Sequence, residues 1–185
     1  MAEAKKVGPC RYLAAAKPLL KRGAVSIFSC SVCGGVFTGW EKGASAPIFT
    51  CCGKPTEKLK PRSAEELPKG ARLYYDIVGG LNENCIRAFW EGEKPEWLFL
   101  STFTGGQYLE LGEKKRAPAV FALAGEDAYA YCDKDPCEMC SFRCKNGFVL
   151  YAYYKDLGLF ELPLNQIAAT QGTLTNRTNM PPHNQ

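Results

Sequence analysis

The stretch AVSIFSCSVCGG, residues 24–35, decides the first part of the fold, because an apolar strand pattern runs directly into two cysteines. A second stretch, APIFTCCG at 46–53, leads to another cysteine pair. Cys-x2-Cys-Gly is typical of a zinc-ribbon knuckle, where the glycine permits a tight turn and lets backbone amides point at the sulfurs. We therefore expect these cysteines to bind one Zn²⁺. The expected ligands are Cys30, Cys33, Cys51 and Cys52.

The second pair departs from the usual knuckle, because Cys51 and Cys52 are adjacent. Neighbouring side chains in an extended strand point to opposite sides. The two sulfurs can therefore reach one metal only if the backbone bends sharply, and Gly53 is a residue typical of such a bend. The alternative is that one of the pair is a core thiol, and that the fourth ligand is Cys10 or Cys85.

A second cluster, CDKDPCEMCSFRC at 132–144, has the spacing C-x4-C-x2-C-x3-C. Four thiolates form a closed tetrahedral site, which is typical of structural zinc. C-x4-C-x2-C is also the spacing of plant-type two-iron clusters, which would make the protein an electron carrier or redox sensor, but their fourth ligand lies much further along. Disulfides or partial ligation are the remaining alternative. The expected zinc ligands here are Cys132, Cys137, Cys140 and Cys144.

The composition favours metal ligands over disulfide bridges for the ten cysteines of this 185-residue chain. Lysines interrupt the N-terminal segment, so it does not resemble an export signal, and no stretch approaches the roughly 18 apolar residues of a membrane span. We expect a soluble, cytoplasmic protein with no membrane span. In a reducing compartment close-spaced cysteines are more often metal ligands. We thus expect two Zn²⁺ per chain, each coupled to folding.

The pattern of strands and cysteines predicts a mainly β or α+β fold. It would combine a zinc-ribbon-like module, an antiparallel β-domain and two structural four-cysteine zinc sites. Frequent aromatic residues favour strands, and the Ala/Leu/Lys-rich segment 10–22 predicts a short helix. Gly105-Gly106 predicts a hairpin turn. The expected divisions are a helix and zinc module at 1–55, a linker at 56–70, a β-rich domain at 71–165 and a disordered tail at 166–185.

The residues that most enzymes need are scarce. The single histidine, His183, argues strongly against both a Ser-His-Asp triad and a Cys-His pair. No phosphate-binding loop of the G-x-x-x-x-G-K-[ST] type occurs. We therefore expect a protein that is not an enzyme and has no small-molecule substrate.

The net charge of +4 permits an anionic partner but does not demand one. Zinc ribbons often bind nucleic acid through loop lysines and aromatic side chains. This hypothesis would use Trp40, Trp90 and Trp97 for stacking on bases, although core packing is the more usual role of a tryptophan. The candidate nucleic-acid contacts are Lys54, Lys58, Lys60 and Arg62.

The segment CSVCGG…TCCGKPTEKLKPRSAEELPKGARLYY resembles the zinc-finger region of coronavirus non-structural protein two. The likeness lies in the order of the cysteines, in the Leu67-Pro68 step before a strand, and in a later cysteine cluster between strands. It extends over roughly residues 25–155. The resemblance implies a zinc-stabilised viral non-structural protein without catalytic activity, acting in the host-cell cytoplasm. It would engage host proteins, and RNA binding is the alternative function.

Overall fold

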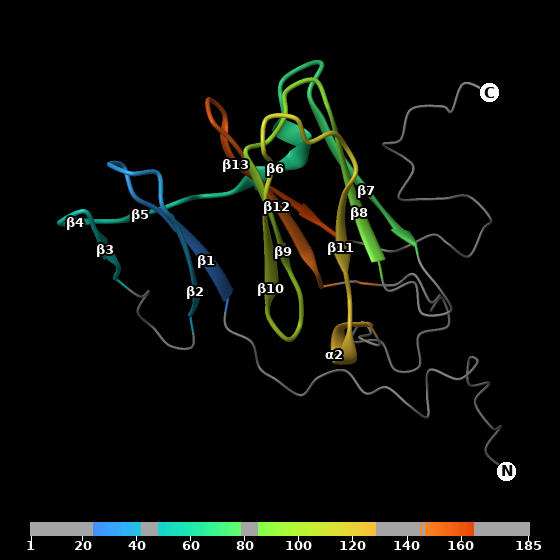
Figure 1. Cartoon of the computed structure of the whole chain (residues 1–185), viewed down its shortest axis with the longest axis horizontal. Helices are drawn as coiled ribbons and strands as arrows, with labels where there is room; N and C mark the ends of the chain where they lie inside the picture. The colour runs from blue at the N-terminus through green and yellow to red at the C-terminus, as the bar shows by residue number, and fades with distance from the viewer. Residues whose placement is uncertain (1–23, 42–47, 79–84, 129–144, 146, 165–185) are drawn as a thin grey trace, which may run out of the picture.

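The computed structural model describes residues 24–41, 48–78, 85–128, 145 and 147–164. Within these ranges the chain is built almost entirely of strands, and most strand pairs are antiparallel (Figure 1). The prediction of a mainly β chain is confirmed. The expected helix at 10–22, the cysteines of 132–144 and the tail at 166–185 lie outside the described residues.

The first sheet has the order β2-β1-β5, and a small hairpin made of β3 and β4 accompanies it. The bounds of its strands are Ala24–Ser29 for β1, Val36–Glu41 for β2 and Glu57–Lys58 for β5. The hairpin consists of Thr50–Cys51 (β3) and Lys54–Pro55 (β4). We call the described residues 24–60 the cysteine module.

Two larger sheets form the rest of the described chain, residues 62–164, which we call the sandwich. One has the order β10-β9-β12-β13-β6, with bounds Gly106–Glu110, Trp97–Ser101, Val149–Tyr154, Gly158–Pro163 and Arg62–Ser63. The other has the order β11-β8-β7, with bounds Ala119–Ala122, Cys85–Glu91 and Arg72–Val78. A 3-10 turn, η1 (Ala64–Glu66), and a short helix, α2 (Gly125–Ala128), complete the elements.

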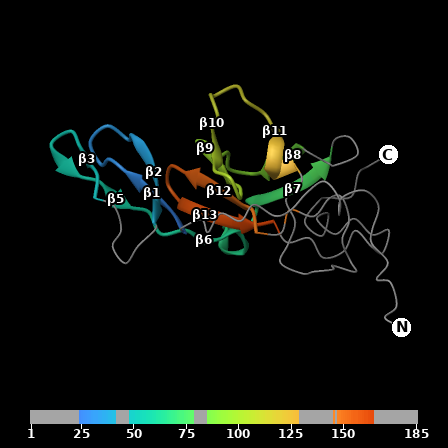
Figure 2. The same cartoon turned by 90° about the horizontal axis from the view of Figure 1, so that it is seen from below.

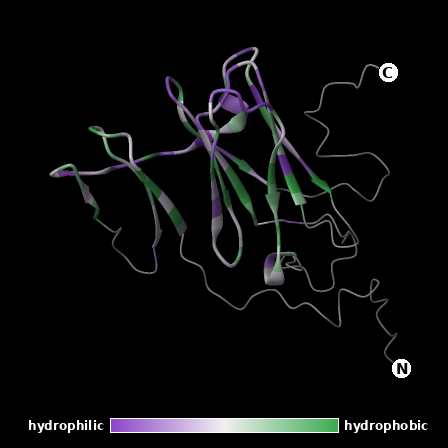
Figure 3. Ribbon diagram, in the orientation of Figure 1, coloured by the Kyte–Doolittle hydropathy of each residue, from purple (hydrophilic) through white to green (hydrophobic). Residues whose placement is uncertain are grey.

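The hydrophobic core lies between the two larger sheets. In β12 every second residue is buried, and Leu150, Ala152 and Tyr154 point into this core. Ile86 and Ala88 enter it from β8 on the opposite sheet. Figure 3 shows the corresponding hydrophobic colouring along the strands, while many of the connecting loops are hydrophilic. The alternation that the sequence carries therefore defines the inner faces of a β-sandwich.

Strand β9 departs from alternation because both of its faces are covered. Leu98 and Leu100 belong to the core between the large sheets. Trp97 and Phe99 point the other way and pack with Ile27 of β1. The five-stranded sheet is thus the middle of three layers, with the cysteine module on its outer face (Figure 2). A continuous apolar run such as WLFLS is typical of a strand buried on both sides.

The expected linker at 56–70 connects the module to the sandwich, but it also pairs with both. Strand β5 lies against β1, and β6 lies parallel to β13. Ser63 and Glu66 form a capping box around η1. This segment therefore holds its two neighbours in place through backbone pairing.

The expected turn at Gly105-Gly106 joins β9 to β10. The Thr102 N–H donates to the Gly105 carbonyl at 2.9 Å, and Ser101 pairs with Gly106. A Cβ at Gly106 would lie 2.3 Å from the ring of Phe99, so a side chain cannot be accommodated there without displacing that ring. Among the described residues, no helix has the length and apolar character needed to cross a membrane.

Candidate metal centre

Cys30 and Cys33 lie on the knuckle between β1 and β2. The Cys30 N–H donates to the Gly35 carbonyl, and the Gly34 N–H donates to the Cys30 carbonyl, each at 2.9 Å. Gly34 has a φ of 70°, a conformation that glycine adopts without steric cost. The amides of Cys33 and Val32 point at the Cys30 sulfur and lower the pKa of its thiol from 9.0 to about 7. The backbone of the knuckle thus favours the thiolate form of Cys30.

The adjacent cysteines lie on a tight hairpin turn. Strand β3 ends at Cys51, β4 begins at Lys54, and the two residues between them, Cys52 and Gly53, have φ values of 51° and 73°. Two successive positive φ values are the mark of a type I′ turn, where Asn-Gly is the preferred pair. A cysteine in this left-handed conformation costs about 1–3 kcal/mol. The turn supplies the sharp bend that neighbouring ligands require.

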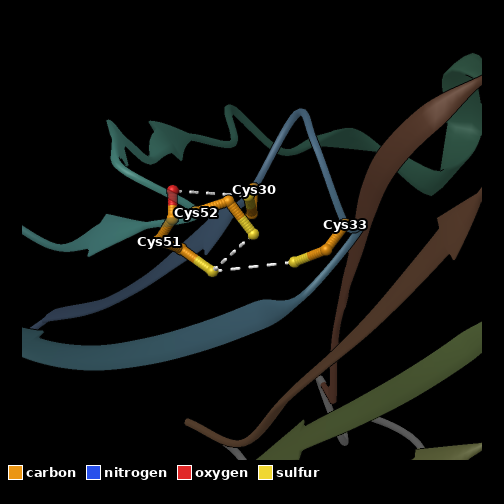
Figure 4. Close-up of side chains that lie close together, drawn as sticks. All are labelled: Cys30, Cys33, Cys51 and Cys52. Atoms are coloured by element: carbon orange, nitrogen blue, oxygen red, sulfur yellow. Dashed lines mark hydrogen bonds between the residues drawn. The ribbon is translucent and has the colours of Figure 1, made fainter.

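The two hairpins bring the four thiols together (Figure 4). All four sulfurs lie within 4.8 Å of one another. The Sγ of Cys51 is 3.6 Å from that of Cys33 and 3.9 Å from that of Cys52. Sulfurs placed about 2.3 Å from a central ion lie about 3.8 Å apart in a tetrahedron. The group could therefore hold a single metal ion.

The same spacing argues against two other kinds of sulfur chemistry in this state. A disulfide needs its two sulfurs about 2.05 Å apart. A multi-iron cluster spreads its cysteines over several irons, so at least some sulfurs must lie further apart than in a group centred on one ion. The separations here fit one ion with four thiolate ligands.

The thiols also perturb one another's protonation. Hydrogen bonds with Cys33 and, to a smaller extent, with Cys30 raise the pKa of Cys51 from 9.0 to about 12. The pKa of Cys52 is raised, chiefly by Cys33. Several thiolates without a cation would repel one another, so protons remain on part of the group. A divalent ion at the centre would displace these protons.

The group is closed on one side and open on the other. Cys30 is buried, Cys51 is half-buried, and Cys33 and Cys52 are exposed. Cys85 is not part of the group; it begins β8 in the three-stranded sheet, where burial raises the pKa of its thiol. Cys10, the other alternative ligand, lies outside the described residues, as do Cys132, Cys137, Cys140 and Cys144.

The basic residues near the knuckle are partly engaged within the protein. Lys58 Nζ donates to Glu41 Oε1 at 2.6 Å and lowers the pKa of that carboxyl, which Ser26 also contacts. The guanidinium of Arg62 lies 4.3 Å from the centre of the Phe160 ring and donates to the Leu157 carbonyl. These contacts join strands and give both residues a structural role.

All four candidate nucleic-acid contacts, Lys54, Lys58, Lys60 and Arg62, are exposed. Trp97 has the core-packing role that is the more usual one for a tryptophan, and it is not available to stack on bases. It is 4% exposed and stacks on Tyr153 with ring centres 5.2 Å apart, because the cysteine module covers this face. Trp90 is half-buried and packs against the core, whereas Trp40 is 39% exposed.

Sequence reasoning missed a buried polar cluster formed by Asp127, Lys145 and their partners. Lys145 is fully buried and donates to the carbonyl of Ala128 at 2.7 Å. Asp127 accepts hydrogen bonds from the N–H and hydroxyl of Thr104. Lys145 therefore connects the two described residues that flank 129–144 in the sequence, Ala128 and itself, through a buried hydrogen bond. A lone lysine after a cysteine-rich segment gave no signal that it would be buried.

The comparisons with known proteins bear on the fold. No protein-family model and no curated protein matches the chain. Among solved structures, the chain is similar to the superoxide reductase from Treponema pallidum, with a TM-score of 0.50 and 14% sequence identity. The match covers 77% of this chain and 99% of that chain. At this identity the likeness shows a shared β architecture and nothing further.

That solved structure is of an enzyme, whereas the sequence led us to expect a protein without catalytic activity. A likeness in fold does not transfer an activity. The absence of catalytic function therefore stays a prediction, and so do the second zinc site and the resemblance to the viral non-structural protein.

Proposed function

We propose that this chain is a metal-binding protein in which Cys30, Cys33, Cys51 and Cys52 hold one Zn²⁺ in a structural site. The observation that carries the proposal is the arrangement of the four sulfurs, which lie within 4.8 Å of one another on two separate hairpins. A site closed by four thiolates leaves no position for substrate. The ion would cross-link the knuckle to the Cys52–Gly53 turn, and so stabilise a module with few buried side chains of its own.

The remaining part of the expected function is engagement of host proteins, with RNA binding as its alternative. The module carries exposed Lys54 and Lys60, and also the exposed side chains of Val32 and Ile48. These features support a contact surface without naming its partner. Lys58 and Arg62 are exposed as well, and the ion pair with Glu41 offsets the charge of Lys58.

A second candidate is a mononuclear iron site that exchanges single electrons. Tetrahedral four-sulfur geometry suits iron as well as zinc, and the exposure of Cys33 and Cys52 would give an electron donor or acceptor access to the sulfurs. Because the fold is similar to that of a superoxide reductase, superoxide is the first electron acceptor to test. In this case the protein would be coloured and redox-active.

Elemental analysis and a visible spectrum of protein purified without chelator test both candidates. The Cys33→Ser variant should contain one metal equivalent less than the wild type. The matched control is Cys85→Ser, which changes a cysteine outside the group and should keep the full content. Zinc without colour supports the structural site, whereas iron with visible absorption supports the electron-transfer site. Equal metal content in the wild type and Cys33→Ser would overturn the metal-binding proposal.

A further inference from the structure

The four-cysteine group combines two close sulfurs on different hairpins, and one of them belongs to an exposed residue. Cys33 lies on the β1–β2 knuckle and is exposed, while Cys51 ends β3 and is half-buried. Their sulfurs are 3.6 Å apart. A movement of under 2 Å, roughly, would bring them to the 2.05 Å of a disulfide bond. The ends of two short hairpins can supply such a movement more easily than the interior of the sandwich.

The other cysteines of the group are less suited to this bond. Cys30 is 4% exposed and is surrounded by the amides of its own knuckle, so an oxidant has little access to it. Cys51 and Cys52 are 3.9 Å apart but adjacent in the chain. A bridge between them would close a very small ring through one peptide bond, whose planarity resists the distortion.

We propose that the four-cysteine group is a site of oxidative modification, at which a peroxide joins Cys33 to Cys51 in a disulfide and the metal ion is released. The inference rests on the proposed metal-binding function and adds a chemical response to it. The bond would link the same two hairpins that the ion links. Oxidation would thus exchange one cross-link of the module for another.

The reaction balances as follows. The Cys33 sulfur attacks one peroxide oxygen, the O–O bond breaks, and the leaving hydroxide takes up a proton to become water. The Cys51 sulfur then attacks the sulfur of the resulting Cys33 sulfenic acid, the S–S bond forms, and a second hydroxide leaves and is protonated. Two electrons pass from the two sulfurs to the peroxide. Two thiolates then remain to bind the ion, and two ligands in place of four release it.

The sequence makes the bond directly observable. Trypsin cleaves after Arg22, Lys42 and Lys58 but not at the Lys54-Pro55 bond, so Cys30 and Cys33 fall on peptide 23–42, and Cys51 and Cys52 fall on peptide 43–58. A bond between Cys33 and Cys51 joins the two peptides. Fragmentation of the joined species then shows which two cysteines remained free to be alkylated.

The experiment uses the full chain loaded with metal. Its metal content is measured first, hydrogen peroxide is added, and the released ion is followed with a colorimetric chelator before alkylation and digestion. We expect loss of one metal equivalent, with joined peptides alkylated at Cys30 and Cys52. Dithiothreitol should restore metal binding. Cys52→Ser should still give the joined peptides, whereas Cys51→Ser should abolish the Cys33–Cys51 bond.

Other outcomes would overturn the inference. They are a bond within peptide 23–42, sulfinic acids without joined peptides, joining through Cys52, or oxidation confined to the cysteines at 10 and 132–144. A wild type that contains no metal before peroxide is added would instead refute the proposed function. Failure of the inference is therefore distinguishable from failure of the site.

Discussion

The cysteine module and the sandwich are both β structures, but different forces hold them together. The sandwich buries long apolar side chains from six strands in one core. In the module the buried residues are few, among them Ile27, Phe28 and Cys30. The module compensates by packing Ile27 on the outer face of the five-stranded sheet and by gathering four thiols at its tip. A small β unit with little core of its own needs such a cross-link.

The largest expected effect is that of removing the metal ion that we propose the four thiols bind. A strong chelator should unfold the module and leave the sandwich folded, because structural zinc contributes on the order of 10 kcal/mol in small zinc-binding units. Hydrogen exchange measured by NMR checks this prediction. Protection should be lost in β1 and β2 and retained in β9 and β12. Equal protection in all four strands after chelation would mean that the docking contacts alone hold the module.

The next effect should come from the core of the sandwich. Phe160 is fully buried, packs edge-to-face on Tyr154 and supports the guanidinium of Arg62. Phe160→Ala should lower the free energy of unfolding by about 3–5 kcal/mol, through lost burial and the cavity left behind. Urea denaturation of the metal-loaded protein measures it. Val120→Ala, at a residue 52% exposed on β11, is the control and should change stability by about 0.5 kcal/mol or less.

Acid should weaken metal binding to the module while the apolar core of the sandwich has no such dependence. The pKa of Cys30 is lowered to about 7, so above this pH its sulfur is already an anion, and below it the metal must displace a proton. Cys51, with its pKa raised to about 12, keeps its proton throughout this range. Affinity should therefore fall more steeply below pH 7 than above it.

The size of this change is set by one additional proton. Below pH 7 the metal affinity should fall by a further factor of about ten, or about 1.4 kcal/mol, for each pH unit. Competition with a chelator of known affinity at about pH 6, pH 7 and pH 8 measures the two slopes. A single slope across the range would show that the knuckle amides do not favour the Cys30 thiolate.

An effect of similar, small size concerns the turn that carries Cys52. Gly53 has a φ of 73°, and Gly53→Ala should cost about 1–2 kcal/mol because an L-residue resists this conformation. A Cβ at Gly53 meets nothing within 4 Å, so the effect would come from the backbone alone. Gly112→Ala in the sandwich is the control, since Gly112 is equally open and has no positive φ. A chelator titration of both variants should show weaker metal binding for Gly53→Ala only.

Much of the fold was predictable because its signals are local. The frequent aromatic residues and the Gly105-Gly106 turn indicated strands and a hairpin, and both are present. The strand pairing within the linker at 56–70 could not be predicted, because β5 and β6 are two residues each and their pairing depends on β1 and β13. Trp97 was ambiguous for a similar reason, since its burial depends on a module distant in the sequence.

The sequence by itself determined the β character of the chain and the two short stretches that carry the four cysteines, because strand alternation and glycine turns are encoded in neighbouring residues. Only the tertiary structure decided that Cys51 and Cys52 face Cys30 and Cys33, and that Cys85 lies elsewhere. It also placed the module on the outer face of the five-stranded sheet. These outcomes depend on packing between segments far apart in the chain, where no local pattern specifies which surfaces meet.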